Sequence, residues 1–214
     1  MKAVIFDLDG VVVNTAKYHY LAWKKLAAEL GFEFEEVHNE RLKGVSRMES
    51  LNIVLEVGGI TGLTEEEKRE LADRKNRYYL EMIAKLDQSE ILPGIREFLD
   101  RLHEEGYKTA LGSASKSGGM ILEKLGLSGR FDVIVDGNLV EKPKPDPEVF
   151  VKGARLLHIP CEECVVVEDA RAGVEAAHAG NMKCIGIGSS EILGEAELVV
   201  SDTTKLLQVD LEEL

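Results

Sequence analysis

Two acidic residues, spaced one apart, end the first apolar segment of the chain. The run Ala3-Val4-Ile5-Phe6 is followed by Asp7-Leu8-Asp9-Gly10. Residues i and i+2 of a strand share a face, so we expect both carboxylates to project the same way from a buried strand end. Neighbouring carboxylates repel unless a cation neutralises them, which favours Mg²⁺. One carboxylate could then attack phosphorus while the other moves protons, although a plain Asp-Gly turn is the alternative.

Two later segments carry groups that suit an anion. Ser113-Ala114-Ser115-Lys116-Ser117 follows a strand pattern, and its backbone N–H groups could bind an anion. The alternative is an ordinary helix cap. Lys144 lies in a loop fixed by prolines, where a cation would offset carboxylates and phosphoryl oxygens. We prefer Lys144 to Lys142 on the Lys-Pro-x-Pro pattern and interpret Lys142 as a solvated surface residue.

A second acidic pair, Glu168-Asp169, ends a strand rich in valine. Acids in such a place are costly without a cation. The sequence therefore predicts a metal site formed by Asp7, Asp9, Glu168 and Asp169, in which Asp9 contributes its main-chain carbonyl and waters complete the shell.

Composition restricts the possible partners. The chain has 214 residues and a formal net charge of −13, which disfavours nucleic acid and anionic membranes. It shows no membrane-spanning run and no signal-peptide pattern. The cysteines, Cys161, Cys164 and Cys184, favour a reducing cytoplasm. Cys161 and Cys164 have the spacing of half a zinc site that no second pair completes, so we interpret them as buried thiols. We expect a cytoplasmic monomer.

Apolar periodicity predicts an α/β protein: a Rossmann-like parallel sheet core with helices on both faces, plus an inserted α-helical cap domain. We expect the core at residues 1–15 and 87–214 and the cap at 16–86. The expected helices cover residues 15–30, 39–42, 47–56, 64–85, 95–105, 147–157 and 173–179, and a further helix follows Ser113 and runs through residue 125. The expected strands cover residues 3–6, 108–112, 132–135, 164–168, 183–187 and 197–200. Gly186-Ile187-Gly188 lacks the third glycine of a dinucleotide fingerprint, and no helix is expected after it.

The segment Asp7-Leu8-Asp9-Gly10-Val11 with Thr15 resembles the first signature of the haloacid dehalogenase superfamily of phosphotransferases. Ser113, Lys144 before Pro145, and Glu168-Asp169 match its other three signatures in order. Within that superfamily, the chain resembles the β-phosphoglucomutase family in Thr15-Ala16, Tyr18-His19, Ala22-Trp23, Leu42 to Arg47, Arg74-Lys75-Asn76 and Ser113 to Lys116.

This resemblance implies a Mg²⁺-dependent enzyme that interconverts β-glucose 1-phosphate and 6-phosphate, with β-glucose 1,6-bisphosphate as the intermediate. It implies that Asp7 carries the phosphoryl group and that Asp9 acts as acid and base, while Ser113, Ala114 and Lys144 neutralise phosphoryl oxygens. A cap that closes over the core would hold the sugar phosphate, with Arg47 on the distal phosphate. The implied substrate-binding residues are His19, Trp23, Leu42, Lys43, Gly44, Val45, Ser46, Arg47, Lys75, Ser113, Ala114, Ser115, Lys116 and Ser117.

Two positions depart from the family pattern. Asn14 stands where an Asp is usual, and Ser117 stands where an Asn is usual. They leave the superfamily assignment intact: Asn14 lies at the expected hinge, and Ser117 can still donate a hydrogen bond over a shorter reach. A sugar-phosphate phosphatase is the main alternative, with water as the acceptor. A non-catalytic sugar-phosphate sensor would be favoured only if Asp7 or Asp9 were missing. Without the resemblance, Lys43 and Arg47 would be interpreted as exposed cations of a connecting loop, and His19 as a surface histidine of a helix.

Overall fold

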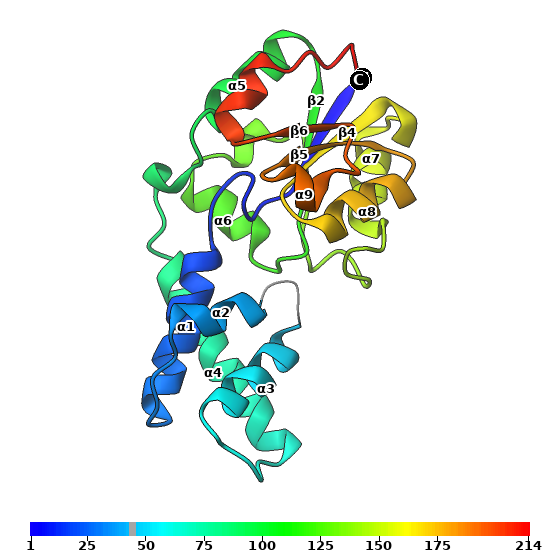
Figure 1. Ribbon diagram of the computed structural model, residues 1–214. Coiled ribbons are helices and arrows are strands. Elements are labelled where there is room, and N and C mark those ends of the chain that lie inside the picture. The colour runs from blue at the N-terminus through cyan, green and yellow to red at the C-terminus, as the bar shows by residue number, and fades with distance from the viewer. Residues whose placement is uncertain (43–45) are drawn as a thin grey trace. The chain divides into compact units, whose positions relative to one another are not determined.

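The computed structural model describes residues 1–42 and 46–214, and the chain divides into two compact units (Figure 1). The first, here called the α/β unit, comprises Met1–Asn14 and Leu86–Leu214. The second, the helical unit, comprises Thr15–Lys85. The expected residues Lys43, Gly44 and Val45 lie outside the described residues.

The α/β unit is built on a parallel sheet in the order β3-β2-β1-β4-β5-β6. Its central strand β1 pairs with β2 on one side and with β4 on the other, and its residues are fully buried. Because all strands run the same way, the residues that follow β1, β2 and β4 emerge at one edge of the sheet. The strand bounds are β1 Ala3–Phe6, β2 Lys108–Gly112, β3 Val133–Val135, β4 Cys164–Glu168, β5 Lys183–Ile187 and β6 Leu198–Val200.

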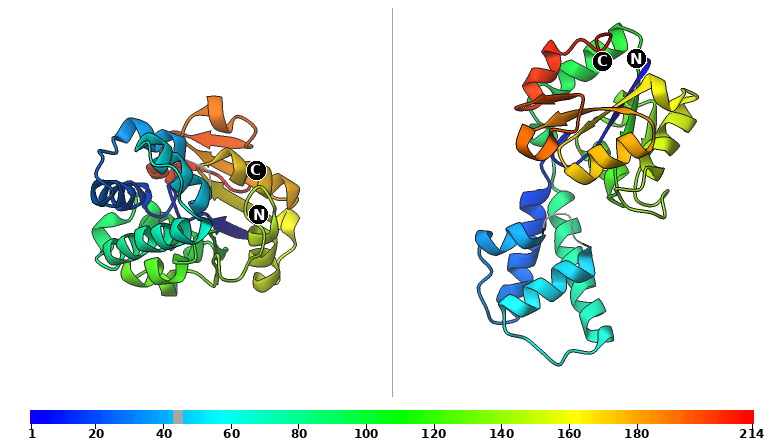
Figure 2. Two further views of the ribbon diagram at one scale, coloured as in Figure 1. Left: turned by 90° about the horizontal axis from the view of Figure 1, so that it is seen from below. Right: turned by 45° about the vertical axis from the view of Figure 1, so that its right-hand side comes forward.

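Helices cover both faces of this sheet (Figure 2). Ile5 packs in one apolar cluster with Phe150 of α7 and Val174 of α8. Its neighbour Phe6 points to the other face and meets Phe98 of α5 edge-on, with ring centroids 5.8 Å apart. The helices of this unit are α5 Ile95–Glu104, α6 Gly118–Lys124, α7 Glu148–Leu157, α8 Arg171–Ala179 and α9 Ser190–Leu193.

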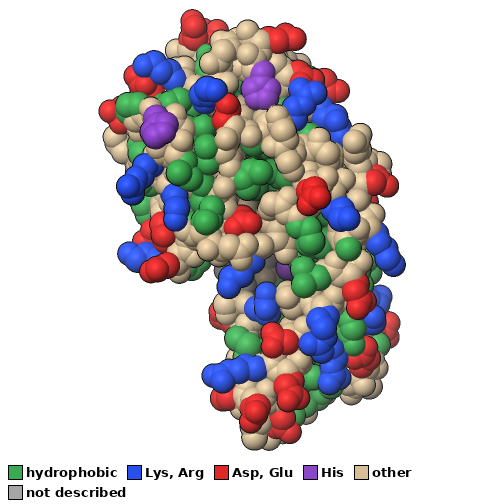
Figure 3. All heavy atoms as spheres, turned by 180° about the vertical axis from the view of Figure 1, so that it is seen from behind, with side chains coloured by type: hydrophobic (Ala, Val, Ile, Leu, Met, Phe, Trp, Pro, Cys, Tyr) green, Lys and Arg blue, Asp and Glu red, His purple; other side chains and the backbone are tan. Residues whose placement is uncertain are grey.

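The helical unit has a core of its own, which includes Trp23, Leu26, Phe34 and Leu51. The Thr64 side chain accepts a hydrogen bond from the Glu67 amide and Glu67 returns one to the Thr64 amide, so a capping box starts the long helix α4. The bounds are α1 Ala16–Glu29, α2 Glu36–Asn39, α3 Arg47–Val57 and α4 Glu65–Ile83. Figure 3 shows acidic and basic side chains interspersed on the face it draws.

The structure confirms the predicted fold class and reproduces the expected ranges of β1, β2, β4 and β5. It also corrects details. The helix expected at 39–42 is α2 followed by a 3₁₀ turn, Glu40–Leu42. The short helix α9 follows β5, where no helix was expected, because Ser189 accepts a hydrogen bond from the Glu191 amide and caps it. Along the described ranges, no helix is long and apolar enough to cross a membrane.

Candidate functional site

A buried ion-pair cluster lies at the edge of the sheet where β1 and β4 end. Lys144 Nζ donates to Asp7 Oδ1 at 2.5 Å and to Glu168 Oε1 at 2.7 Å. All three side chains are at most 11% exposed. The second oxygen of Glu168 accepts a hydrogen bond from the Ala170 amide at 2.6 Å. Both oxygens of Glu168 are therefore engaged by the protein, and this carboxylate fixes the ammonium group that contacts Asp7.

The Lys144 ammonium has little freedom to move. It lies 4.5 Å from the centroid of the Phe150 ring, which favours a cation at its face. Burial disfavours the charged form of Lys144, yet the carboxylates of Asp7 and Glu168 outweigh burial and raise its pKa. Lys142, the other lysine of this loop, has a side chain 70% exposed and pairs with Asp146 at 3.6 Å. The structure thus places Lys144, and not Lys142, against the first aspartate.

Two glycines make room for the acidic side chains. A Cβ on Gly173 would lie 2.0 Å from the Glu168 carboxyl carbon. A Cβ on Gly10 would lie 1.8 Å from Asp169 Oδ2, and Gly10 has a φ of +78°, a conformation that favours glycine. The glycine of the Asp-Leu-Asp-Gly segment therefore allows the Asp169 carboxylate to approach the loop after β1.

Burial and the mutual repulsion of the carboxylates raise the pKa values of Asp9 and Asp169. Burial, helped by the charges of Asp7 and Asp169, raises the pKa of Asp9 to about 8. Desolvation and the charges of Glu168 and Asp7 raise the pKa of Asp169 to about 7, although part of this residue is open to solvent. Without a further cation, Asp9 therefore holds a proton at neutral pH.

Carboxylate oxygens are the ligands that a hard divalent cation prefers. The carboxylates of Asp7, Asp9, Glu168 and Asp169 influence one another, and Lys144 is the cation that offsets them. Each Glu168 oxygen already accepts a hydrogen bond, whereas Asp7 Oδ2 accepts none from the described residues and Asp169 is exposed, so Asp7 and Asp169 are the better candidates for direct ligation. Among the residues that the structure describes, no group of three or more His, Cys, Asp or Glu side chains could hold a metal ion. The remaining ligands would therefore be main-chain oxygens and waters, as expected for the Asp9 carbonyl.

The loop from Ser113 to Ser117 follows β2. Ser113 is buried, and its hydroxyl accepts a hydrogen bond from the Ser115 amide at 3.1 Å. The Ser115 hydroxyl in turn accepts one from the Ser117 amide at 3.2 Å. Helix α6 begins only at Gly118, and Ser117 precedes it without a side-chain capping bond. Lys116 is exposed and forms no ion pair with the described residues.

A second polar cluster lies inside the helical unit. Lys75 of α4 is 2% exposed, and its Nζ lies 2.7 Å from His19 Nδ1 of α1. The same ammonium lies 4.7 Å from the Trp23 ring centroid and 5.3 Å from that of Tyr79. His19 stacks on Tyr79 with centroids 4.0 Å apart. Tyr79 was not expected from the sequence, although it lies one helical turn after Lys75.

Burial in this cluster lowers the pKa values of both Lys75 and His19. Burial lowers the pKa of Lys75 to about 7, with a smaller effect from Arg47. Burial, together with Lys75 and Arg47, lowers the pKa of His19 to about 3, so the imidazole is neutral. Within the described part of the chain, Lys75 has no carboxylate partner. A buried ammonium without a counterion favours an anionic or hydroxyl-rich ligand.

The other residues expected to bind substrate are less constrained. Ser46 caps α3 by accepting a hydrogen bond from the Glu49 amide at 3.2 Å. The Arg47 side chain is 47% exposed and lies 4.0 Å from Asp73. Leu42 is half-buried against the core of the helical unit. Ser46 thus caps α3, Arg47 lies at the distance limit of an ion pair with Asp73, and the substrate-binding roles expected for both residues stay predictions.

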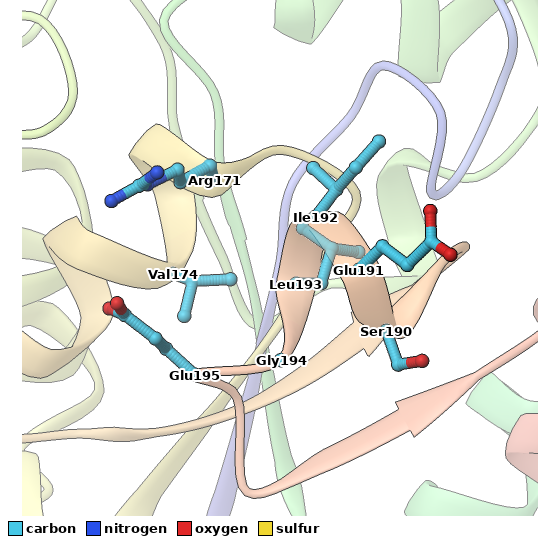
Figure 4. A pocket seen from close by; sticks show the side chains of 8 residues that line it. All are labelled: Arg171, Val174, Ser190, Glu191, Ile192, Leu193, Gly194 and Glu195. Carbon is cyan, nitrogen blue, oxygen red and sulfur yellow. The ribbon is translucent and has the colours of Figure 1, made fainter.

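The α/β unit also contains a small pocket. It has a volume of about 150 Å³ and lies between α8 and α9, lined by Arg171, Val174 and residues 190–195 (Figure 4). None of the residues expected from the sequence lines it. Arg171 at its rim pairs with Glu175 at 2.9 Å. The buried cluster of Asp7, Lys144 and Glu168 is therefore not part of the lining of this pocket.

Comparison with known proteins adds independent information. A family model described as haloacid dehalogenase-like hydrolase matches residues 1–181. The β-phosphoglucomutase of Bacillus subtilis is 44% identical over 207 residues, which cover 96% of this chain and 92% of that protein. The "phosphorylated carbohydrates phosphatase" of Thermotoga maritima is 33% identical over 187 residues, which cover 86% and 84%. The crystal structure of a β-phosphoglucomutase from Clostridium difficile matches with a TM-score of 0.85 at 42% identity, covering 100% of this chain and 95% of that one.

Proposed function

The chain belongs to the haloacid dehalogenase-like hydrolase family, and we propose on that premise that it is a β-phosphoglucomutase. It would interconvert β-D-glucose 1-phosphate and β-D-glucose 6-phosphate through β-glucose 1,6-bisphosphate. The observation that carries the proposal is the buried cluster of Asp7, Lys144 and Glu168, because it places the Asp7 carboxylate directly beside a fixed cation. The similarity to the β-phosphoglucomutases of Bacillus subtilis and Clostridium difficile supports the choice of substrate.

Asp7 is the proposed nucleophile. Its carboxylate attacks one phosphorus of β-glucose 1,6-bisphosphate, the bond from that phosphorus to the sugar oxygen breaks, and an aspartyl phosphate forms on Asp7 as the glucose monophosphate leaves. Lys144 contacts Asp7 Oδ1 and is held by Glu168, so its charge is already in place when negative charge develops on the phosphoryl oxygens. Little covalent chemistry remains for the protein beyond positioning and charge stabilisation.

Asp9 is the proposed general acid and base. Burial raises the pKa of Asp9 to about 8 in the metal-free protein, so its carboxyl group is suited to hold a proton and give it to the departing sugar oxygen. The resulting carboxylate can then take the proton of the hydroxyl that attacks the aspartyl phosphate in the second half of the cycle. Asp7 and Asp9 would thus divide nucleophilic and proton-transfer work between them.

The remaining charge of the phosphoryl group needs further donors. We assign this role to the Ser113 hydroxyl, the Ala114 amide and the Lys116 ammonium, which belong to the loop after β2. Asp7 and Asp169, with the Asp9 carbonyl, would hold Mg²⁺, which when bound supplies electrostatic stabilisation of phosphoryl oxygens.

The helical unit would bind the sugar and its second phosphate. Lys75, buried and without a carboxylate partner in the described chain, offers an ammonium to sugar hydroxyls or phosphate, and neutral His19 fixes its direction. Arg47 presents a planar guanidinium that suits two phosphate oxygens. We propose that this unit, corresponding to the cap expected from the sequence, contributes both groups to the substrate. The expected cytoplasmic monomer stays a prediction.

Product analysis tests this proposal directly. The protein is incubated with β-glucose 1-phosphate, a trace of β-glucose 1,6-bisphosphate and Mg²⁺, and products are followed by ³¹P NMR. We expect glucose 6-phosphate to accumulate, and we expect a chelator to stop its formation. The Asp7→Asn protein is the matched control. Accumulation of inorganic phosphate alone would contradict a mutase.

A sugar-phosphate phosphatase is the second candidate, and the Thermotoga maritima relative favours it. Arg47→Ala distinguishes the two, since only a mutase must hold a distal phosphate. Truncating a charge-assisted contact costs on the order of 2–5 kcal/mol, so mutase activity should fall roughly 30- to several-thousand-fold while hydrolysis of a small aryl phosphate is retained. Arg41→Ala, at another exposed arginine, is the control. Equal losses in both assays would make Arg47 structural, and no loss would favour the phosphatase.

A further inference from the structure

The loop after β3 packs directly on the loop after β2. Gly137 N donates to Ser115 O at 3.0 Å, and Asn138 Nδ2 donates to Lys116 O at 2.8 Å. A Cβ on Gly137 would lie 2.2 Å from Ala114 O. Three successive carbonyls of the loop after β2 therefore face residues 136–138.

This arrangement sets the direction of the amides in the loop after β2. In a trans peptide the N–H points opposite to the carbonyl of the same unit. The carbonyls of Ala114, Ser115 and Lys116 face residues 136–138, so the N–H groups that follow them point away. Two of those N–H groups, of Ser115 and Ser117, are met by the hydroxyls of Ser113 and Ser115. The Ser115 and Ser117 amides are therefore engaged within the loop, and among the described residues the Lys116 amide between them is the donor left to meet an anion.

The Asp136 side chain stabilises the conformation of the loop after β3, residues 136–138. Its Oδ1 accepts hydrogen bonds from Asn138 N at 3.0 Å and from Asn138 Nδ2 at 3.1 Å. Its Oδ2 lies 3.5 Å from Gly119 N, in the first turn of α6. The Asn138 carboxamide is therefore fixed by a carboxylate before it reaches Lys116 O. Because Asn138 Nδ2 also donates to the Asp136 carboxylate, the orientation of its hydrogen bond to Lys116 O is restricted.

We propose that Asn138 is a positioning residue for phosphate binding, together with Gly137 and Asp136. Asn138 touches neither the phosphate nor the reacting atoms. It acts through the Lys116 carbonyl, which fixes the backbone from which the exposed Lys116 ammonium extends and keeps the Lys116 amide turned toward the anion. The inference rests on the proposed function, because it assumes that the loop from Ser113 to Ser117 binds the phosphoryl group.

Asn138→Ala removes the carboxamide and tests this role. We expect the affinity for inorganic phosphate, measured by calorimetry in Mg²⁺ buffer, to fall about tenfold, the equivalent of one net hydrogen bond. We expect kcat to fall by a similar factor, with the thermal midpoint within a few degrees of the parent. Asn52→Ala, on the exposed face of α3, is the matched control and should change neither value.

Gly137→Ala provides an independent variant. It keeps Asn138 and Asp136 but sets a methyl group against Ala114 O, and its backbone needs no positive φ. Both variants should weaken phosphate binding. Unchanged phosphate affinity in a folded Asn138→Ala protein would overturn the inference, as would an activity loss that only follows the unfolded fraction of both variants. The unmutated protein distinguishes the mutase proposal from the role of Asn138. If it binds phosphate but makes no glucose 6-phosphate, the mutase proposal is refuted and the role of Asn138 is still tested by phosphate affinity.

Discussion

Replacing Lys75 by methionine should stabilise the helical unit while it removes a proposed substrate contact. The pKa of Lys75 is lowered to about 7 from 10.5, and each pH unit between the two values corresponds to about 1.4 kcal/mol. Keeping the ammonium charged in its buried site therefore costs about 4–5 kcal/mol at neutral pH and below. The hydrogen bond to His19 and the contact with the Trp23 ring offset about 1–3 kcal/mol of this.

We expect Lys75→Met to raise the free energy of unfolding by about 1–4 kcal/mol at pH 7, since a methionine of similar length carries no charge to desolvate. The gain should depend on pH. Between pH 7 and 10.5 the unfolded chain binds the lysine proton and the folded chain does not, so the parent becomes more stable as pH rises. The difference between variant and parent should therefore be largest at pH 7 or below and nearly vanish by about pH 10.5.

Urea unfolding followed by tryptophan fluorescence measures this effect in the right part of the molecule. Trp23 is the single tryptophan of the chain, and it lies in the helical unit beside Lys75. Lys85→Met, at an exposed lysine of the same unit, is the control and should change stability by less than about 0.5 kcal/mol. A Lys75→Met protein less stable than the parent at pH 7, or a gain that persists at pH 10, would refute the reasoning.

The other predictions concern the α/β unit. Asp7→Asn should abolish both turnover and covalent labelling by phosphate without unfolding the protein, because an amide cannot attack phosphorus; residual turnover in pure variant would exclude Asp7 as nucleophile. In metal-free buffer, Lys144→Met should lower the free energy of unfolding by about 3–5 kcal/mol, because it leaves buried carboxylates unpaired, whereas Lys142→Met should be nearly neutral; equal effects in urea unfolding would contradict this. Gly173→Ala should destabilise by about 1–3 kcal/mol because its Cβ meets Glu168, whereas Gly153→Ala, whose nearest contact is 3.5 Å, should be neutral or stabilising; thermal melts that rank them the other way would disprove the steric argument.

The local pattern of apolar residues in the sequence was sufficient to predict the architecture of the protein. Continuous runs of valine and isoleucine between amphipathic segments predict a parallel sheet covered on both faces, because each strand must be buried twice. The strand β4 could be placed to the residue, since Cys164 and Glu168 bound a run of three valines. The short helix α9 was missed, because four residues are too few to show a helical period and only Ser189 signals its start.

The identities of the candidate residues also came from the sequence. Acids at strand ends and a lysine between prolines are unusual enough to be chosen before any fold is known. The pairing of Lys144 with both Asp7 and Glu168 could not be predicted in this way, because it joins residues 137 positions apart through two strand ends and a loop. The same holds for Tyr79, which has no unusual neighbour in the sequence and becomes notable only where it stacks on His19.

The sequence alone thus determined which chemistry the chain can carry, because the number and type of carboxylates, lysines and glycines do not depend on folding. Only the tertiary structure decided which of these groups are desolvated and which face one another. Lys144 is buried whereas Lys142 is exposed, and burial raises the pKa of Asp9 to about 8. It also leaves Lys75 without a carboxylate partner among the described residues. The physical reason is that charge interactions strengthen as water is excluded, and water is excluded only when distant segments pack together.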